Sequence, residues 1–189
     1  MRIISGSAKG RRLVSVPGPG TRPITDRVKG ALFNILGADI EEATFLDLFA
    51  GTGSVGLEAL SRGASHVVFV DRARKAIETL RRNLEATGFS SWAEVVHEDS
   101  FRFLQHSAPN LVFDYIYVAP PQYQGLWAQV LLALNDRPLL AADGLIIVQI
   151  HPKEFRDLQL PRLHQIRERR YGSTALHFYE LAPADQESA

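Results

Sequence analysis

The sequence predicts an α/β fold built on a mostly parallel sheet, and three observations lead to that prediction. From residue 44 to residue 150, strand-like apolar runs alternate with amphipathic helical patterns, which is typical of right-handed βαβ units and a sheet covered on both faces. A glycine-rich turn at residues 51–56 separates the first strand of this series from the first helix. The last two strands are joined by Tyr171-Gly172-Ser173, a turn too short for a helical crossover, so they must be antiparallel.

Ahead of this series, residues 1–40 predict a small hairpin and a helix. Residues 2–6 and 10–16 have the composition of two short strands joined by a tight turn. The Pro/Gly run 17–20 breaks the chain, and Thr25 or Asp26 would cap a helix that ends near Gly37. The apolar positions of this helix keep the spacing of three and four residues: Val28, Ala31, Leu32, Ile35 and Leu36.

The remaining elements follow in regular order. The expected strands are 44–50, 66–71, 93–97, 111–118, 144–150, 162–170 and 174–181, and the expected helices are 54–62, 73–87, 100–105 and 124–134. Five parallel strands closed by an antiparallel pair are the layout of the Rossmann-like class I methyltransferase fold, with a seven-stranded, mostly parallel sheet and an antiparallel last strand. We expect an appendage over residues 1–40, the main domain over 41–181 and a disordered polar tail over 182–189.

Composition narrows the class of protein. With 189 residues and 46% hydrophobic content, the chain suits one domain with a substantial core. It has no cysteine, and its six histidines show no spacing of metal ligands, so no metal is expected. No run of eighteen apolar residues and no apolar leader is present, so we expect a cytoplasmic, monomeric protein without a membrane partner.

The glycine turn indicates a nucleotide-type cofactor. Gly51, Gly53 and Gly56 fit the G-x-G-x-x-G fingerprint, and Asp71 lies about twenty residues beyond the first glycine, where a ribose-binding carboxylate is expected. This match alone does not separate NAD from S-adenosylmethionine. Asp47 favours S-adenosylmethionine, because a carboxylate just before the turn would repel a pyrophosphate but can approach an ammonium group directly or through water.

Several side chains are candidates for contact with this cofactor. Asp71 would accept both ribose hydroxyls, or else cap the helix that begins near Arg72. Asp99 would contact the adenine amino group, or else cap the helix 100–105. Asp47 would meet the ammonium group, or else satisfy loop amides. The full set of expected cofactor contacts is Asp47, Phe49, Gly51, Gly53, Asp71, Asp99 and Ser100.

Motifs outside the glycine turn resemble the RsmD family, the 16S rRNA (guanine966-N2)-methyltransferases. The family opening Met-Arg-Ile-Ile-Ser-Gly-x-x-x-Gly is matched by residues 1–10, and Thr-Arg-Pro-x-x-Asp-Arg-Val is matched by residues 21–28. Residues 33–36, 47–53 and 57–64 also look like that family, and the resemblance runs over most of residues 1–181. The N-terminal motifs are more specific than the glycine turn because they lie outside the generic cofactor fold.

The resemblance implies methyl transfer from S-adenosylmethionine to the exocyclic amine of a guanine in 16S rRNA or the small ribosomal subunit. Relatives carry Asp- or Asn-Pro-Pro-Tyr/Phe after the fourth strand. There, the acid or amide and a proline carbonyl accept the hydrogens of the amine, and the aromatic ring stacks on the extruded base. The matching segment in this chain is Ala119-Pro120-Pro121-Gln122-Tyr123.

This segment departs from the family pattern at two positions. Ala119 stands where the acid is expected and Gln122 where the aromatic is expected, with Tyr123 one place late. The Pro120 carbonyl stays available, Gln122 offers an amide oxygen, and Tyr123 or Tyr117 offers a ring. Our hypothesis is that Pro120 and Gln122 recognise the amine and Tyr123 stacks on the base. The alternative is a pocket that has lost activity or acts on a different acceptor.

Charge points to a nucleic-acid contact ahead of the cofactor motif. The whole chain has a formal net charge of zero, but residues 1–40 hold seven basic and two acidic side chains. Such a segment would contact phosphates, or else form a solvated surface. With the resemblance, we expect rRNA phosphates to bind Arg2, Lys9, Arg11, Arg12, Arg22 and Arg27. Two further classes stay open: an RNA-binding protein that binds the methyl donor without chemistry, and an NAD-dependent oxidoreductase.

Overall fold

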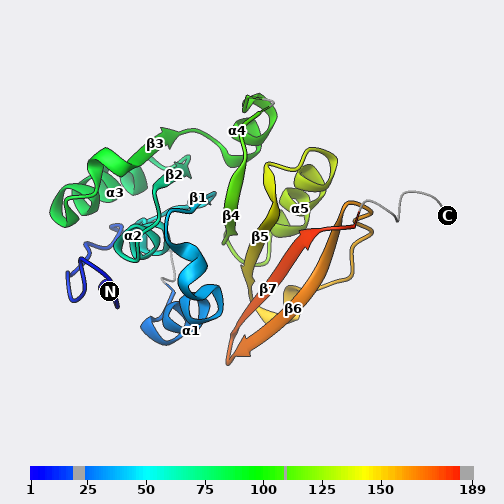
Figure 1. Ribbon diagram of the computed structural model, residues 1–189, viewed down its shortest axis with the longest axis horizontal. Helices are drawn as coiled ribbons and strands as arrows, with labels where there is room; N and C mark the ends of the chain where they lie inside the picture. The colour runs from blue at the N-terminus through cyan, green and yellow to red at the C-terminus, as the bar shows by residue number, and fades with distance from the viewer. Residues whose placement is uncertain (19–23, 109, 184–189) are drawn as a thin grey trace. The chain divides into compact units, whose positions relative to one another are not determined.

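The structure is a computed structural model that describes residues 1–18, 24–108 and 110–183 (Figure 1). The chain divides into two compact units, residues 1–100 and 101–189. Two predictions fall outside the described residues: the phosphate contact of Arg22, and the tail from residue 184 onward. The predicted domain boundaries at residues 40 and 181 stay predictions.

The first unit contains three parallel strands in the order β3-β2-β1. Its elements are α1 (Asp26–Leu36), η1 (Gly37–Ile40), β1 (Thr44–Asp47), α2 (Ser54–Ser61), β2 (His66–Asp71), α3 (Arg74–Thr87), η2 (Ser90–Trp92) and β3 (Ala93–His97). The strand side chains alternate into a buried core in which Phe45 and Phe69 are fully enclosed. Helices α2 and α3 pack on these strands (Figure 1).

Helix α1 forms where the sequence predicts it. The Thr25 hydroxyl accepts a hydrogen bond from the Val28 amide, and the helix ends at Gly37 with a positive φ of 63°. The predicted hairpin before it is present in a shorter form. Arg2 and Arg12 make one antiparallel β-bridge, and the flanking pairing is limited to a few backbone bonds, among them that from the Ile3 amide to the Arg11 carbonyl. The extended strands expected over 2–6 and 10–16 do not form.

Buried side chains in the first unit replace the missing strand pairing. Both carboxylate oxygens of Glu58 accept the amides of Ile4 and Ser5, at 2.8 and 3.0 Å. The Asn83 amide group bonds both the amide and the carbonyl of Val14, at 2.8 and 3.1 Å. The N-terminal backbone is therefore satisfied by helices α2 and α3 instead of by a second strand.

The second unit contains four strands in the order β4-β5-β7-β6. Strands β4 (Phe113–Val118) and β5 (Leu140–Ile150) are parallel, whereas β7 (Thr174–Leu181) is antiparallel to both β5 and β6 (Leu163–Tyr171). The other elements are α4 (Ser100–His106), which begins at the last residue of the first unit, α5 (Leu126–Asp136) and η3 (Pro152–Glu154). The antiparallel pair is therefore confirmed.

Strand β5 begins four residues earlier than the sequence predicts. Leu140 pairs with Phe113, and the next pair is Leu145 with Tyr115, so the register shifts between them. A β-carbon on Gly144 would lie 2.9 Å from the Asp114 carbonyl oxygen, so a glycine is needed where the backbones approach. An irregular stretch of this kind interrupts the alternation of apolar residues that the prediction used.

Candidate functional site

The glycine turn of the first unit has the conformation that its sequence predicts. Gly51 and Gly53 adopt φ of 55° and 75°, values that residues with a β-carbon rarely adopt. A β-carbon on Gly51 would meet no atom within 4 Å, so this side of the turn is open. A β-carbon on Gly53 would lie 2.2 Å from the Leu80 Cδ1 atom, so Gly53 also allows α3 to pack against the turn. Helix α2 begins directly after Gly53.

Asp47, the last residue of β1, is a buried carboxylate with one unused oxygen. Its Oδ2 atom accepts a hydrogen bond from the Gly56 amide at 3.3 Å, near the N-terminus of α2. Its Oδ1 atom is buried without any hydrogen-bond partner. Burial raises the pKa of Asp47 to about 7; the Gly56 amide partly opposes this and the nearby Asp71 adds to it.

The two roles considered for Asp47 are therefore divided between its oxygens. Oδ2 satisfies a helix amide, and Oδ1 is free to meet an ammonium group. An unsatisfied buried carboxylate oxygen is costly, and a cationic group of a bound ligand would remove that cost. The residue fits the ammonium end of S-adenosylmethionine.

Asp71 closes β2 and connects the turn to helix α3. Its Oδ2 atom accepts the Gly51 amide and its Oδ1 atom accepts the Ala73 amide, both at 2.8 Å. Each carboxylate oxygen has a second lone pair, so these bonds leave acceptor capacity for two ribose hydroxyls. The Ala73 contact matches the alternative in which Asp71 organises the start of α3, and the two roles are compatible.

The other predicted cofactor residues differ in what their side chains do. Ser100 is buried, and its hydroxyl donates to the Leu48 carbonyl just after β1. That bond gives Ser100 a structural role beside the glycine turn. The Asp99 carboxylate is half-buried and lies 3.9 Å from the Arg72 guanidinium. Phe49 is also half-buried and precedes the turn.

Two buried polar residues that sequence reasoning missed connect the N-terminal segment to the glycine turn. The Lys29 ammonium is fully buried, lies 3.2 Å from Glu58, and donates to the Arg2 carbonyl and the Ser54 hydroxyl at 2.8 and 3.1 Å. Asn83, which holds Val14, also donates to the Thr52 carbonyl at 2.9 Å. A lysine on the buried face of α1 was the available signal, because an unpaired charge there would be unstable.

The predicted phosphate contacts of the first unit are exposed. These are Arg2, Lys9, Arg11, Arg12 and Arg27. Arg2 also makes an ion pair of 3.0 Å with Asp26, whose side chain is itself partly exposed. An exposed ion pair of this kind contributes little to stability, so it does not prevent Arg2 from binding a phosphate.

The second unit carries the segment matched to the acceptor motif, here called the acceptor loop (residues 119–125), between β4 and α5. Pro120 is buried, and Gln122 and Tyr123 are exposed. Tyr117, the other candidate ring, is buried, and its hydroxyl donates to the Gln149 side-chain oxygen at 2.6 Å. Tyr123 is therefore the ring that a base can reach without rearrangement of the core.

Two more residues that the sequence did not indicate, His151 and Glu154, contact Tyr123. The Glu154 Oε2 atom accepts the Tyr123 amide at 2.6 Å. The His151 ring lies with its centroid 5.4 Å from that of Tyr123. Both residues follow β5, about thirty positions along the chain from the loop, and no local pattern connects them to it.

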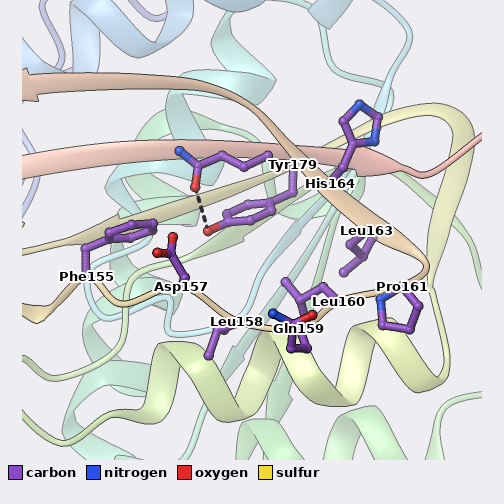
Figure 2. A pocket seen from close by; sticks show the side chains of 10 residues that line it. Phe155, Asp157, Leu158, Gln159, Leu160, Pro161, Leu163, His164 and Tyr179 are labelled. Atoms are coloured by element: carbon purple, nitrogen blue, oxygen red, sulfur yellow. Dashed lines mark hydrogen bonds between the residues drawn. The ribbon is translucent and has the colours of Figure 1, made fainter.

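The second unit also has a groove of about 550 Å³, and Tyr123, His151 and Glu154 are not among the residues that line it. Figure 2 shows the lining side chains. The segment 155–161 forms one wall, and Leu163, His164, Gln165 and Tyr179 from β6 and β7 form the other. The Tyr179 hydroxyl bonds the Gln165 side chain at 3.2 Å, and burial raises the pKa of Tyr179 to about 12. No predicted site residue lines this groove.

Two other expectations concern metal and membrane. Among residues 1–18, 24–108 and 110–183, no group of three His, Asp or Glu side chains is arranged to hold a metal ion. None of the helices in the described part of the chain is long and apolar enough to cross a membrane.

The parallel strands, the antiparallel last pair and the glycine turn define the Rossmann-like fold of S-adenosylmethionine-dependent methyltransferases. The structure of yhhF from Escherichia coli is similar, with a TM-score of 0.84 and 34% identity, over 96% of this chain and 97% of that one. The family model described as "Conserved hypothetical protein 95" matches residues 1–180, so the chain belongs to that family, the RsmD family that the motifs resemble.

Two relatives extend over nearly the whole chain. YlbH of Bacillus subtilis is 38% identical over 185 residues, covering 95% of this chain and 98% of the relative. Ribosomal RNA small subunit methyltransferase D of Escherichia coli K12 is 36% identical over 181 residues, covering 95% of this chain and 89% of the relative.

Proposed function

We propose that this protein is an rRNA methyltransferase that uses S-adenosylmethionine and modifies the N2 amine of a guanine in 16S rRNA. The observation that carries the proposal is the match of nearly the whole chain to the Escherichia coli relative named ribosomal RNA small subunit methyltransferase D. That match includes the N-terminal segment as well as the cofactor fold. It favours S-adenosylmethionine over NAD, as does the unused Asp47 oxygen.

The first unit supplies the residues for the methyl donor. Asp47 Oδ1 would accept the ammonium group, and Asp71 would accept the ribose hydroxyls while it holds the Gly51 amide. Gly51 leaves the turn open toward the ligand. Phe49, Gly53, Asp99 and Ser100 complete the proposed donor contacts. When bound, S-adenosylmethionine supplies an electrophilic methyl group.

The second unit supplies the residues for the acceptor. The lone pair of a guanine N2 amine is delocalised into the ring, so the amine is a poor nucleophile until its hydrogens are oriented. The Pro120 carbonyl and the Gln122 amide oxygen would accept those hydrogens and direct the lone pair. Tyr123 would stack on the extruded base, a contact worth about 1–3 kcal/mol. The exposed basic residues of the N-terminal segment would hold rRNA phosphates.

A second candidate function follows from Ala119. Its methyl side chain cannot accept a hydrogen bond where relatives carry an acid or amide. A protein that binds the donor and rRNA without transferring a methyl group would tolerate this residue. Turnover distinguishes the two functions, because the second predicts donor binding without methyl transfer.

The test of the acceptor assignment is methyl transfer to small ribosomal subunits by the wild type and three variants. Tyr123→Ala should slow transfer by about 5- to 150-fold, the rate equivalent of the stacking energy. Gln122→Ala should slow it through loss of amine orientation. Gln129→Ala, an exposed position on α5, is the matched control and should leave the rate unchanged. If both Gln122→Ala and Tyr123→Ala transferred methyl groups at the wild-type rate, the assignment would be refuted.

A further inference from the structure

Tyr123 has an unusual backbone conformation for an aromatic residue. Its φ is 60°, and among the described residues other than glycine only Glu42 also has a positive φ. A β-carbon is crowded in this region, which glycine and asparagine tolerate far better than tyrosine. Strained residues of this kind persist only where the surroundings hold them, and they cluster at functional sites. The contacts of Tyr123 therefore identify what holds it.

Glu154 is the residue that fixes the Tyr123 backbone. Its Oε2 atom accepts the Tyr123 amide at 2.6 Å, a short bond to a charged acceptor. Its Oε1 atom accepts the His151 amide at 3.2 Å. The His151 Nδ1 atom in turn accepts the Lys153 amide at 3.1 Å, which completes a reciprocal cap on η3. Both Glu154 oxygens are thus engaged, and the carboxylate cannot easily rotate away from the loop.

His151 supports the Tyr123 side chain as Glu154 supports its backbone. The two ring centroids are 5.4 Å apart, with an angle of 39° between the ring planes. This is an aromatic contact, and it restricts the tyrosine ring. Tyr123 nevertheless keeps 66% of its surface exposed, so most of the ring is open for another planar group.

An aromatic stack anchors the support in the core of the second unit. Phe155, the next residue after Glu154, stacks on His177 at 4.5 Å and on Trp127 at 6.0 Å. His177 and Trp127 are almost completely buried. Trp127 belongs to α5, which directly follows the acceptor loop, so the loop and the residues that support it are fixed to the same stack.

We infer that Glu154 and His151 are positioning residues for the acceptor base. Glu154 holds the Tyr123 backbone in the left-handed conformation, and His151 restricts the ring so that its open surface is presented to the extruded guanine. This inference rests on the proposed function. It also accounts for the position of the aromatic residue, which stands one position later in this chain than in the motif of the relatives. A tyrosine at that later position needs a different backbone conformation to present its ring, and Glu154 and His151 hold it there.

A double-mutant cycle on methyl transfer to small ribosomal subunits tests the inference. Glu154→Ala should lower kcat/KM by about 10- to 100-fold, the loss expected when a reacting group is misplaced. In the Tyr123→Gly background the backbone bond to Glu154 stays but the ring is gone, so the same substitution should lower kcat/KM by a much smaller factor. His151→Ala should lower kcat/KM and be silent in the Tyr123→Gly background, and His151→Phe should recover part of the loss. Glu180→Ala, a carboxylate of β7 away from the loop, is the control.

Unfolding in urea separates positioning from a structural role. Tyr123→Gly and Tyr123→Ala both remove the ring, but only alanine keeps a β-carbon at the positive φ, so the unfolding midpoint should be higher for Tyr123→Gly than for Tyr123→Ala while transfer falls in both. The inference is overturned if Glu154→Ala lowers the midpoint but leaves kcat/KM unchanged, or if its loss of rate is equal in both backgrounds. A wild-type protein that transfers no methyl group would instead contradict the proposed function. A Tyr123→Gly midpoint no higher than that of Tyr123→Ala would still contradict the strain at residue 123.

Discussion

Replacing Asp47 by asparagine should make the protein more stable at alkaline pH and weaken its binding of the methyl donor. Burial raises the pKa of Asp47 from its ordinary value of 3.8 to about 7. A carboxyl group with a raised pKa stabilises the folded state fully below pH 3.8, and that contribution is lost as the pH rises through 7. The wild type is therefore penalised at pH 8, and a residue that does not ionise avoids the penalty.

The size of the effect follows from the two oxygens of Asp47. The difference between 3.8 and about 7 corresponds to at most about 4 kcal/mol of unfolding free energy. An asparagine oxygen would keep the bond from Gly56, but its NH₂ group would stand where Oδ1 has no partner, at a cost of about 1–3 kcal/mol. The variant should thus gain about 1–3 kcal/mol at pH 8. At pH 5 the folded aspartate is neutral and only the unfolded carboxyl is ionised, so the wild-type penalty falls to about 2 kcal/mol, close to the cost of the asparagine NH₂ group, and the two proteins should have similar stability.

Urea unfolding between pH 5 and pH 8, together with calorimetry of S-adenosylhomocysteine binding, measures both effects. Loss of a charge-assisted bond to the ligand ammonium should weaken binding at pH 8 by about 10- to 150-fold. Asp143→Asn, an exposed position on β5, is the control and should change neither quantity. Parallel stability profiles for Asp47→Asn and the wild type across this pH range would refute the raised pKa. Unchanged ligand affinity would refute the ammonium contact.

Further substitutions test other parts of the first unit. Gly53→Ala should lower the unfolding free energy by about 1–3 kcal/mol and weaken S-adenosylhomocysteine binding in calorimetry, because the added β-carbon overlaps the α3 packing at a positive φ. Lys29→Met should cost about 1–3 kcal/mol in urea unfolding, since it removes one buried partner of Glu58 and leaves the Arg62 ion pair at 2.9 Å. Arg11→Gln and Arg12→Gln should each reduce the salt dependence of rRNA binding, with a change in the log–log slope of about 0.7–0.9 in filter binding.

Matched controls make these results specific. Gly51→Ala also requires a positive φ but meets no neighbour, so it should destabilise less than Gly53→Ala. Arg81→Gln, an exposed position on α3, should leave the salt slope unchanged if the N-terminal segment binds the phosphates. A slope that falls equally in Arg81→Gln would show that the binding is not localised there. A Lys29→Met variant with wild-type stability would mean that the buried ion pair does not hold the N-terminal segment.

The spacing of apolar residues and the turn residues predicted most helices and strands, because each of these elements depends mainly on residues close to it in the sequence. Strands β2, β3 and β7 have the predicted bounds, and the antiparallel pairing of β6 and β7 followed from the length of one turn. The N-terminal strands are shorter than predicted for a physical reason. Their backbone bonds go to Glu58 and Asn83, which lie more than fifty residues away. No alternation of apolar residues reports such partners.

The candidate site likewise contains residues that the local sequence predicts and residues that only the fold brings together. The glycine turn, Asp47 and Asp71 could be predicted as candidates from the sequence because a phosphate- or donor-binding turn needs these residue types at fixed spacing, and they stay predictions. Glu154 and His151 were not found, because only the fold brings them to Tyr123. A glutamate at the third position of a short turn predicts a cap, and nothing in the local sequence predicts that its second oxygen reaches the acceptor loop.

The most direct test of the proposed function is nucleoside analysis of small ribosomal subunits after incubation with the protein and S-adenosylmethionine labelled on its methyl group. Subunits from cells that lack this gene should gain label in the 16S rRNA, and mass spectrometry of the digested nucleosides should find that label in N2-methylguanosine at a single site. Label in another nucleoside, or calorimetric binding of the donor without any transfer of label, would contradict the assignment of Pro120, Gln122 and Tyr123 to guanine N2 methylation.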